Sequence, residues 1–365
     1  MRLKFHKKCS VHTRGDFVAN ITYDNHQFEI NEPETVLEGL ERSGFKIPFS
    51  CRVGICHSCL MQANLQPPFS SQIGLSDNQK AQNYFLACSC IPKKAMSISI
   101  IGNTNKINGI IKDRTFVNGQ VLILKIEVDC RWYPGQAVDV WYDDYEARPY
   151  SIASRYDHNK TIELHIKKHD QGLVSLWLHN EVAIGQSIRL SKPSGNFFYN
   201  DNQQNKALLM VGTGTGLAPL YGIVQEAIHQ KHQAPIYIYI AASKKADLYY
   251  VDQLNFLCSR YNNIHYIPTV RHAYTHKYDQ DINSGNDADD ITSADIISLE
   301  SIEYGGEIVN LIKKNHPNLK DWKVFLSGNP DMVKKAQREC FFLGAGVGDI
   351  YADAFVVQQK SLQNS

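Results

Sequence analysis

The pattern of apolar and polar residues along the chain changes twice, and its first part mixes strands with a helix. Residues 16–30 form two short alternating runs around Asp24-Asn25, which predicts two β-strands joined by a tight turn. A helix is predicted over 33–43, because Pro33 stands near its start and apolar residues recur at helical spacing up to Gly44.

Residues 107–200 show the alternation of an all-β region. Turn signals such as Asn118-Gly119 and Pro134-Gly135 separate runs in which apolar and polar residues alternate. The runs are 110–114, 121–128, 138–141 and 162–166. Short strands at this spacing predict a β-barrel, with one short helix over 173–180.

From residue 206 onward, apolar runs alternate with amphipathic segments. The predicted strands are 206–211, 236–241, 324–327 and 349–356, and the predicted helices are 217–230, 248–259 and 330–341. Because strands alternate with helices, we expect a parallel sheet with helices on both of its faces.

These changes of pattern predict domains at residues 1–103, 104–203 and 204–365, which fits a chain of 365 residues. The polar, turn-rich residues 102–106 form the first linker. An Asp-rich insertion at 271–306 interrupts the last domain. We interpret it as a solvated surface segment, with an acidic docking lobe as the alternative.

Charge and hydropathy exclude two classes of partner. Lys and Arg total 38 and Asp and Glu total 37, so no large basic field exists and nucleic acid is not expected to bind. The most apolar window, 207–224, is broken by glycines and threonines, which predicts a strand and helix rather than a membrane span. Residues 1–8 are basic but lack the apolar core of a signal peptide, so we expect a cytoplasmic protein.

Four cysteines carry the strongest chemical signal. Cys51, Cys56 and Cys59 have the spacing C-x4-C-x2-C, and Cys88 follows further on, which is the ligand pattern of plant-type [2Fe–2S] ferredoxins. Gly54 would let backbone N–H groups approach the cluster sulfurs. A zinc site or buried structural cysteines are the alternatives, but zinc ribbons carry two C-x2-C pairs. The remaining cysteines, expected to be reduced thiols, are Cys9, Cys90, Cys130, Cys258 and Cys340.

Two motifs in the all-β region have the chemistry to bind a nucleotide cofactor. In Arg148-Pro149-Tyr150-Ser151, an arginine can pair with pyrophosphate, a tyrosine can cover a flat ring and a hydroxyl can hydrogen-bond a ring nitrogen. Gly172-Leu173-Val174-Ser175 stands at a helix N-terminus, which favours phosphate. Taken singly, each motif also fits a surface strand end or a helix-capping turn.

Two further motifs follow strands of the last domain. In Gly212-Thr213-Gly214-Thr215-Gly216-Leu217-Ala218-Pro219, glycines would let the backbone approach a phosphate, and the proline fits a first helical turn. This is not the Rossmann fingerprint, because Leu217 stands where a third glycine would be. Ser327-Gly328-Asn329-Pro330-Asp331-Met332 again follows a strand and opens a helix, which a plain strand–helix turn would also explain.

In this order, and with Phe355 as a C-terminal aromatic, the motifs resemble the ferredoxin–NADP reductase superfamily. With the cysteine loop, residues 16–356 other than the insertion are similar to the reductase components of bacterial multicomponent oxygenases, such as those of benzoate dioxygenase and phenol hydroxylase. The resemblance implies a β-grasp [2Fe–2S] ferredoxin domain, a Greek-key β-barrel flavin domain and an α/β parallel-sheet nucleotide domain.

The resemblance also implies site residues. Cys51, Cys56, Cys59 and Cys88 would ligate the cluster, and Arg148, Pro149, Tyr150, Ser151, Gly172 and Ser175 would hold FAD. Gly212, Thr213, Gly214, Thr215, Gly216, Ala218 and Pro219 would hold the dinucleotide phosphates, and Gly328, Pro330 and Met332 would line the nicotinamide pocket. Ser151 near the flavin N5, Ser327 and Phe355 beside the isoalloxazine would be the catalytic residues. Many relatives have cysteine at position 327, so a thiol contribution is not expected here.

The function implied is electron transfer from NAD(P)H through FAD and the [2Fe–2S] cluster to an oxygenase or hydroxylase component, directly or through a separate ferredoxin. The alternatives are a stand-alone reductase serving a desaturase or a deoxysugar-type substrate, and a redox sensor. We expect NADH as the donor. NADPH is the alternative, because Ser243-Lys244-Lys245 follow the second strand of the last domain, where a basic residue could take a 2′-phosphate.

Overall fold

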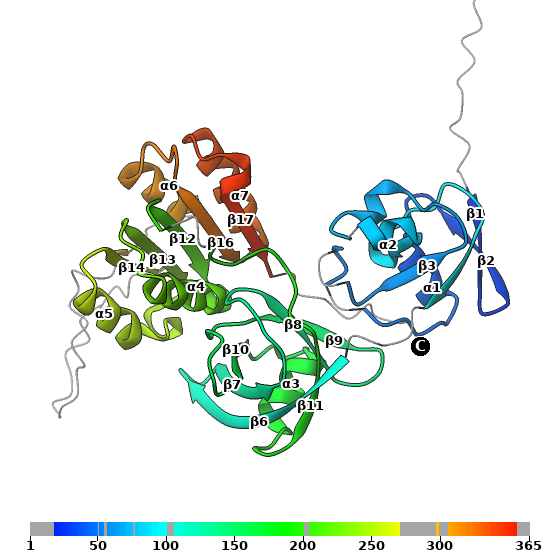
Figure 1. The fold of residues 1–365 in the computed structure, drawn as a ribbon, viewed down its shortest axis with the longest axis horizontal. Coiled ribbons are helices and arrows are strands. Elements are labelled where there is room, and N and C mark those ends of the chain that lie inside the picture. The colour runs from blue at the N-terminus through cyan, green and yellow to red at the C-terminus, as the bar shows by residue number, and fades with distance from the viewer. Residues whose placement is uncertain are drawn as a thin grey trace, which may run out of the picture. The chain divides into compact units, whose positions relative to one another are not determined.

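The computed structural model of the chain describes residues 18–49, 51–54, 57–75, 77–100, 106–200, 204–270, 297–298 and 306–355. The chain divides into two compact units, residues 1–104 and residues 105–365 (Figure 1). The barrel and the parallel sheet therefore lie together in the second unit. Most of the predicted insertion at 271–306 is outside the described residues.

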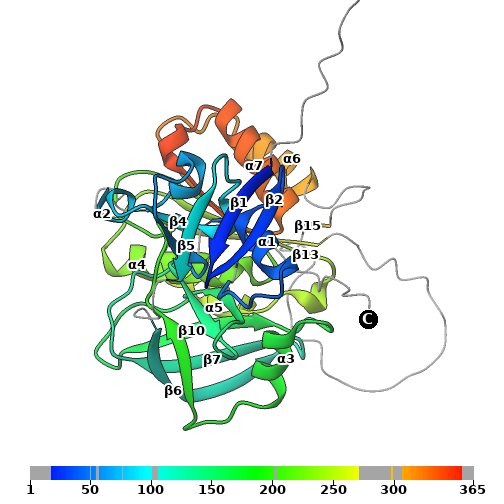
Figure 2. The ribbon, with the colours of Figure 1, turned by 90° about the vertical axis from the view of Figure 1, so that its right-hand side faces the viewer.

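Unit 1 is a β-grasp fold. Its sheet has the order β2-β1-β5-β3-β4, in which β1 and β5 are parallel and the other neighbours are antiparallel. The strands are β1 (Val18–Tyr23), β2 (His26–Asn31), β3 (Leu60–Ala63), β4 (Tyr84–Leu86) and β5 (Met96–Ile100). Figure 2 shows β1 and β2 as a hairpin, with α1 (Val36–Arg42) beside them. A second helix, α2 (Asp77–Ala81), precedes β4.

Helix α1 begins where its sequence provides a cap. The Thr35 hydroxyl accepts from the Glu38 N–H at 3.3 Å, and the Glu38 carboxylate accepts from the Thr35 N–H at 2.8 Å, which forms a capping box. Val36, Leu37 and Leu40 are buried in one cluster with Ile21 and Ile30 of the sheet. The predicted helix over 33–43 is thus confirmed in a shorter form.

The first half of unit 2 is a closed antiparallel barrel of order β10-β7-β6-β11-β8-β9. Its strands are β6 (Lys106–Val117), β7 (Val121–Val128), β8 (Ala137–Trp141), β9 (Ala147–Ser151), β10 (Thr161–Lys167) and β11 (Ser187–Ser191). The ring closes because Ile152, directly after β9, pairs with Leu164 of β10. Helix α3 (Leu173–Asn180) packs Val174 and Leu178 into the barrel core.

The second half of unit 2 is a parallel sheet of order β15-β14-β13-β12-β16-β17. Its strands are β12 (Leu208–Thr213), β13 (Ile236–Ala242), β14 (Ile264–Val270), β15 (Ile297–Ser298), β16 (Lys323–Gly328) and β17 (Ile350–Ala354). Its helices are α4 (Leu217–His229), α5 (Val251–Arg260), α6 (Gly306–Asn315) and α7 (Pro330–Phe342).

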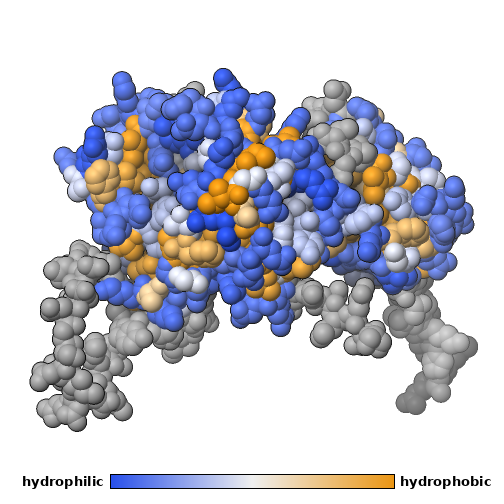
Figure 3. All heavy atoms as spheres, turned by 90° about the horizontal axis from the view of Figure 1, so that it is seen from below, coloured by the Kyte–Doolittle hydropathy of each residue, from blue (hydrophilic) through white to orange (hydrophobic). Residues whose placement is uncertain are grey.

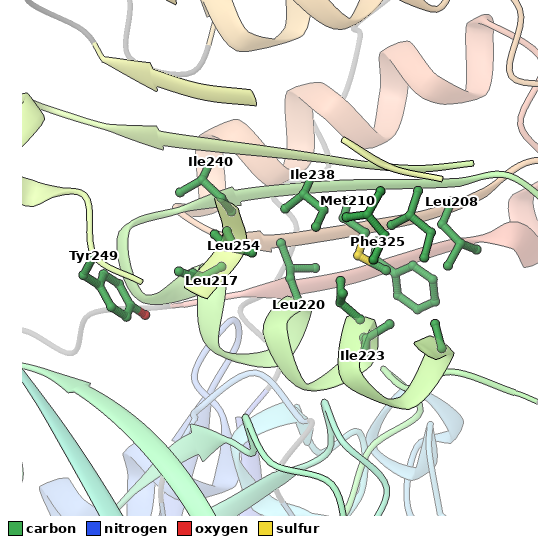
Figure 4. Close-up of a cluster of buried hydrophobic side chains, with 14 of the residues drawn as sticks. Leu208, Met210, Leu217, Leu220, Ile223, Ile238, Ile240, Tyr249, Leu254 and Phe325 are labelled. Atoms are coloured by element: carbon green, nitrogen blue, oxygen red, sulfur yellow. The ribbon is translucent and has the colours of Figure 1, made fainter. Parts of the chain in front are cut away.

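The helices cover both faces of this sheet. Leu220 and Ile223 of α4 pack with Met210 and Ile238 on one face (Figure 4). On the other face, α6 and α7 contribute side chains such as Ile308 and Met332 to a second cluster. Every residue of β12 is buried for this reason. The predicted fold class, with a β-grasp sheet, an antiparallel barrel and a parallel sheet with helices, is confirmed.

A buried polar cluster joins the barrel to the parallel sheet. His165 of β10 is within 2.9 Å of both the Tyr249 hydroxyl and the Glu163 carboxylate. The Tyr250 hydroxyl donates to the same carboxylate at 3.0 Å. Nearby, the Gln225 side chain of α4 donates to the Ala153 carbonyl at 3.1 Å. These contacts explain why the two halves form one compact unit.

The surface is mixed in polarity. On the face shown in Figure 3, hydrophobic residues form separate groups among hydrophilic ones, as is usual for globular proteins. Within the described parts of the chain, no helix has both the length and the apolar composition that crossing a membrane requires.

Candidate functional site

The fold brings Cys59 and Cys88, two of the predicted cluster cysteines, together, and the charge of Cys51 acts on Cys88. Cys59 directly precedes β3 and Cys88 follows β4, and Leu60 of β3 pairs with Leu86 of β4. As a result, the Cys88 N–H donates to the Cys59 sulfur at 3.5 Å, and both residues are buried. Cys51 is half-buried, and Cys56 lies outside the described residues.

The surroundings of these thiols favour ligation. The pKa of Cys88 is lowered to about 7, chiefly by its hydrogen bond with the Cys59 side chain and further by the Ser89 side chain and the Gly54 backbone. The Val53 N–H donates to the Cys51 sulfur at 3.5 Å. Thiolates with hydrogen-bond donors at their sulfurs are the ligands that an iron–sulfur cluster needs.

Cys90 is chemically different although it stands two residues from Cys88. It is fully buried, and burial raises its pKa to about 12. A buried thiol that stays protonated is a poor metal ligand, so we expect Cys90 to be a structural residue and not a ligand. Cys340 is likewise buried, while Cys130 and Cys258 are half-buried, and all three are free thiols.

No set of three or more His, Cys, Asp or Glu that would hold one metal ion occurs in the described parts of the chain. That search does not include Cys56, which lies outside the described residues. The backbone donors at the Cys51 and Cys88 sulfurs fit the thiolate ligands of a [2Fe–2S] cluster.

An ion pair outside the cysteines fixes the loop. The Arg52 guanidinium donates to both oxygens of Glu41 on α1, at 2.9 and 2.5 Å, and lies 4.0 Å from the ring centroid of Phe49. A bidentate pair of this kind restrains orientation as well as position. It ties the cysteine loop to the core helix of unit 1.

The predicted flavin motif forms strand β9. The Arg148 guanidinium donates to the Glu146 carboxylate at 2.8 Å and to the Ala147 carbonyl at 2.7 Å. Tyr150 is half-buried, and burial raises its pKa above the usual value. Ser151 is buried at the end of the strand, while Pro149 is exposed.

Ser151 has a partner that sequence reasoning missed. Its hydroxyl donates to the carboxylate of Asp353 on β17 at 2.7 Å, across the junction between the barrel and the parallel sheet. Asp353 is half-buried, and burial raises its pKa to about 6, although the hydrogen bond from Ser151 lowers it in part. One sequence signal existed, because Asp353 stands two residues before the predicted aromatic Phe355.

The predicted phosphate motif caps α3. Gly172 is the N-cap residue, and a Cβ there would lie 2.5 Å from the Ser175 hydroxyl oxygen. That hydroxyl donates to the Gly172 carbonyl at 3.1 Å and accepts from the His169 N–H at 3.3 Å. Ser175 therefore fixes the turn, and the first N–H groups of the helix are left without a side-chain cap.

The two glycine motifs of the parallel sheet interlock. A Cβ on Gly216 would lie 2.4 Å from the Ser327 carbonyl oxygen, and one on Gly328, where φ is +110°, would lie 2.4 Å from the Thr213 hydroxyl oxygen. The Asn329 N–H donates to that same hydroxyl at 2.7 Å. The carboxyl ends of β12 and β16 thus meet in one place, where ligands of open α/β sheets bind.

The accessible part of the first glycine motif is short. Gly214 and Thr215 are half-buried, and a Cβ on Gly214, where φ is +53°, would meet nothing within 4 Å. The other predicted members, Gly212, Thr213, Gly216, Ala218 and Pro219, are buried. Open space therefore adjoins the backbone at positions 214–215, where the turn leads into α4.

The second glycine motif contains an unpartnered polar atom. Ser327 is fully buried, and its hydroxyl has no hydrogen-bond partner among the described residues. The carbonyl of the next residue, Gly328, accepts the Phe355 N–H at 2.7 Å, which brings the C-terminal aromatic to this turn. Pro330 opens α7, whereas Met332 is fully buried in the core beneath that helix.

Replacing Gly328 with alanine is expected to destabilise unit 2 by about 3 kcal/mol, because the left-handed backbone and the contact with Thr213 both resist a Cβ. Gly185→Ala is the matched control. Its φ is +87° but nothing lies within 4 Å of the added Cβ, so about 1 kcal/mol is expected. Urea unfolding followed by circular dichroism measures both, and equal losses would contradict the interlocked turns.

The comparisons with known families agree with the geometry. Residues 20–93 match the 2Fe-2S iron–sulfur cluster binding domain, residues 109–199 the oxidoreductase FAD-binding domain, and residues 210–338 the oxidoreductase NAD-binding domain. The chain is an NAD(P)H-dependent iron–sulfur flavoprotein reductase. The cluster, FAD and nicotinamide cofactors expected from the sequence are confirmed at the level of these domains.

Curated relatives resemble the reductase along most of its length. Protein RfbI of Salmonella typhimurium is 25% identical, covering 95% of this chain and 99% of its own. The xylene/toluene monooxygenase electron transfer component XylA of Pseudomonas putida is 24% identical, covering 90% and 91%. The CDP-6-deoxy-L-threo-D-glycero-4-hexulose-3-dehydrase reductase of Yersinia pseudotuberculosis is also 24% identical, covering 90% and 95%.

Among solved structures, the cytochrome P450 reductase GcoB of Amycolatopsis superimposes on the reductase with a TM-score of 0.60. The identity is 19%, and the match covers 92% of this chain and 98% of that chain. At this identity the likeness concerns the fold, and it extends over both units.

Proposed function

We propose that the reductase passes electrons from NAD(P)H, through FAD and the [2Fe–2S] cluster, to a separate oxygenase or hydroxylase component, directly or through a further ferredoxin. The observation that carries this proposal is that the cysteine loop belongs to its own compact unit, separate from the flavin–nucleotide unit. A cluster in a separate unit suits delivery to another protein. The name of the Pseudomonas relative, an electron transfer component, supports the same interpretation.

The cofactors supply the redox chemistry, with a hydride donor, a flavin that exchanges one or two electrons and a one-electron cluster. The chain supplies binding and orientation. We propose that Arg148, Tyr150 and Ser151 hold the flavin, and that the α3 N-terminus, shaped by Gly172 and Ser175, binds its pyrophosphate. Arg148 is paired with Glu146 on its own strand, so pyrophosphate would replace or share that carboxylate.

The turn after β12 would take the dinucleotide phosphates at the accessible backbone of Gly214 and Thr215. Ser327, whose buried hydroxyl lacks a partner among the described residues, would hydrogen-bond the nicotinamide. Phe355 follows β17, and its N–H donates to the Gly328 carbonyl in the turn after β16. Its side chain would cover the flavin ring. Met332 would act through packing of α7, because its side chain lies in the core.

Anaerobic addition of NADH to the purified reductase is expected to bleach the flavin absorbance and then the iron–sulfur absorbance. The same protein should reduce cytochrome c rapidly, because the cluster passes single electrons to a protein acceptor. A redox sensor would not need such turnover. Protein that binds no flavin, or whose iron–sulfur absorbance does not respond to NADH or NADPH, would refute the proposal.

We propose NADH as the donor, with NADPH as the alternative. Strand β13 ends at Ala242, and the exposed Lys244 and Lys245 follow it, where a 2′-phosphate of NADPH would meet them. Comparing kcat/KM for the two nucleotides decides the choice. If Lys244→Ala lowers kcat/KM for NADPH only and NADPH is the better substrate, NADH is not the donor.

A reductase that serves a small-molecule pathway is a second candidate. It is favoured by the match to the Yersinia deoxysugar dehydrase reductase. That match covers 90% of this chain, and so does the match to the xylene/toluene monooxygenase component. A gene for a Rieske or di-iron hydroxylase next to that of the reductase would favour the first candidate. A neighbouring dehydrase gene would favour the second.

We propose a cytoplasmic location. Among the described cysteines that are not predicted cluster ligands, Cys90, Cys130, Cys258 and Cys340 form no disulfide, and an oxidising compartment would favour their pairing. NAD(P)H as a reductant fits the same compartment. Fractionation of cells followed by immunodetection tests this, and recovery of the protein from an extracytoplasmic fraction would refute it.

A further inference from the structure

Ser89 directly follows the cluster cysteine Cys88 in the short 3-10 helix Ala87–Ser89. Its hydroxyl oxygen lies 3.6 Å from the Cys88 sulfur, which is hydrogen-bond range for a sulfur acceptor. An iron-bound cysteine is a thiolate and has no hydrogen to give. In the loaded protein the serine hydroxyl must therefore be the donor of this hydrogen bond.

The cysteine loop leaves space for this hydroxyl. Gly54 has a φ of +77°, and a Cβ built there would lie 2.6 Å from the Ser89 hydroxyl oxygen. The next nearest atom, the Ser89 Cβ, would be 3.6 Å away. A side chain at position 54 would thus collide with the hydroxyl and not with the rest of Ser89. This contact is independent of the distance between oxygen and sulfur.

We propose that Ser89 raises the reduction potential of the cluster by donating a hydrogen bond to the Cys88 sulfur. The inference deepens the proposed function, because it concerns the step at which electrons leave the protein. Reduction adds one electron and one negative charge to the cluster and its thiolates, breaks no bond, and draws the electron from NAD(P)H through the flavin. A donor aimed at a thiolate stabilises the more negative state.

Among the donors to these sulfurs that the described residues show, Ser89 is one that a substitution can remove. The Val53 N–H that meets Cys51 and the Gly54 N–H that meets Cys88 belong to the backbone, so a substitution cannot remove them. The hydroxyl can be removed without changing a ligand. Cys88 is buried, so solvent does not replace a missing donor easily and the effect is not screened away.

The test is a redox titration of the full-length reductase followed by electron paramagnetic resonance. Ser89→Ala is expected to make the cluster potential more negative, by a tenfold shift in the one-electron equilibrium or about 59 mV. Ser89→Thr retains the hydroxyl and should remain near the parent value. Ser99→Ala, which removes an exposed hydroxyl from β5 in the same unit, should change nothing. An unchanged potential in Ser89→Ala would overturn the proposal.

A second readout does not depend on how well Ser89→Ala assembles its cluster. Pulsed electron paramagnetic resonance of the reduced parent protein in D₂O should detect an exchangeable deuteron close to the cluster, retained in Ser89→Thr. A spectrum without a deuteron coupling beyond those of backbone amides would overturn the proposal. Flavin reduction by NADH in the same samples shows whether the electron-transfer function itself holds.

The close approach of Gly54 to the Ser89 hydroxyl allows a further test, in which the glycine is replaced instead of the serine. Gly54→Ala is expected to lower the cluster content, because the added Cβ displaces the Ser89 hydroxyl and the backbone there is left-handed. Adding Ser89→Ala should restore part of that content, since the colliding atom is gone. Additive losses in the double variant would contradict the geometry on which the proposal rests.

Discussion

Replacing Cys59 with alanine is expected to abolish cytochrome c reduction by NADH, by about 100-fold or more, while ferricyanide reduction stays within about twofold. Cys59 is a buried predicted ligand, and its sulfur is hydrogen-bonded by the Cys88 N–H. Without it the cluster loses one of four thiolates. Ferricyanide accepts electrons from reduced flavin directly, so its reduction reports only the steps in unit 2.

The division of activity is expected because the chain forms two compact units. Damage to the cysteine loop stays in unit 1, and the flavin and nucleotide motifs lie in unit 2. Steady-state assays with the two acceptors, together with the iron and flavin contents, measure the outcome. A parallel fall of both activities would show that the two units depend on each other for folding.

Cys90→Ala is the matched control for this experiment. Cys90 is as buried as Cys59 and stands two residues from a ligand, but its pKa is raised to about 12 by burial, so it is not expected to bind iron. Its replacement should leave the iron content and both activities near the parent values, at a stability cost of about 1 kcal/mol for the lost packing. Loss of iron in Cys90→Ala would mean that the ligand set is wrong.

The elements that the sequence predicts best are those whose own residues carry the signal. The alternating runs predict β1, β2, β7 and β10, and the Pro330 position predicts the start of α7, where the Asn329 side chain caps the helix. These signals are local. They do not require any knowledge of which strands become neighbours.

The missed elements have weak or conflicting local signals. Strand β14 contains Pro268, which argues against a strand by its missing N–H, yet it pairs with β13. Strand β11 has only five residues, and β3 has four directly after a cysteine ligand. Helix α5 begins at Val251, later than predicted, because Tyr250 adopts a left-handed conformation with φ of 57°.

The site shows the same limit more sharply. The cysteine spacing identifies the cluster ligands, because three of the four are close in sequence. The pair formed by Ser151 and Asp353 spans 202 positions and joins the barrel to the parallel sheet, so only the folded chain reveals it. The approach of Gly54 to Ser89 and of Gly328 to Thr213 belongs to the same class of contact.

Replacing Asp353 with asparagine is expected to remove a pH dependence from the reduction of flavin by NADH. The pKa of Asp353 is raised to about 6 by burial, so its carboxyl changes charge near that pH. As a carboxylate, it accepts a hydrogen bond from the Ser151 hydroxyl, with 2.7 Å between the two oxygen atoms. The serine proton is then not available to another acceptor. As a neutral acid it can donate to the Ser151 oxygen, and the serine proton is then free for another acceptor.

If the serine proton serves the flavin N5, as proposed, stopped-flow rates of flavin reduction should fall as the pH rises through about 6. The Asp353→Asn variant would lack the titration and keep the rate of the low-pH form, because the introduced amide donates at every pH. Ser151→Ala should slow the reduction roughly a hundred- to a thousandfold at all pH values, which is about the effect of removing one hydrogen-bond donor from a reacting centre.

The raised pKa also has a consequence for stability. The folded state holds the Asp353 proton more tightly than the unfolded state. The stabilisation that this proton adds to the free energy of unfolding is therefore complete below about pH 4 and is lost as the pH rises through about 6. Asp353→Asn should therefore gain stability relative to the parent at about pH 7 and not at about pH 4. Urea unfolding at the two pH values measures this difference.

Asp349→Asn is the control that separates this pair from a general effect of removing a carboxylate. Asp349 precedes β17 and forms an ion pair with Lys323 at 2.5 Å, so its loss should lower stability and leave the pH profile of flavin reduction unchanged. The combination of Ser151→Ala with Asp353→Asn should be no slower than Ser151→Ala alone, since both act through one proton. An inflection near pH 6 that persists in Asp353→Asn would assign the titration to another group.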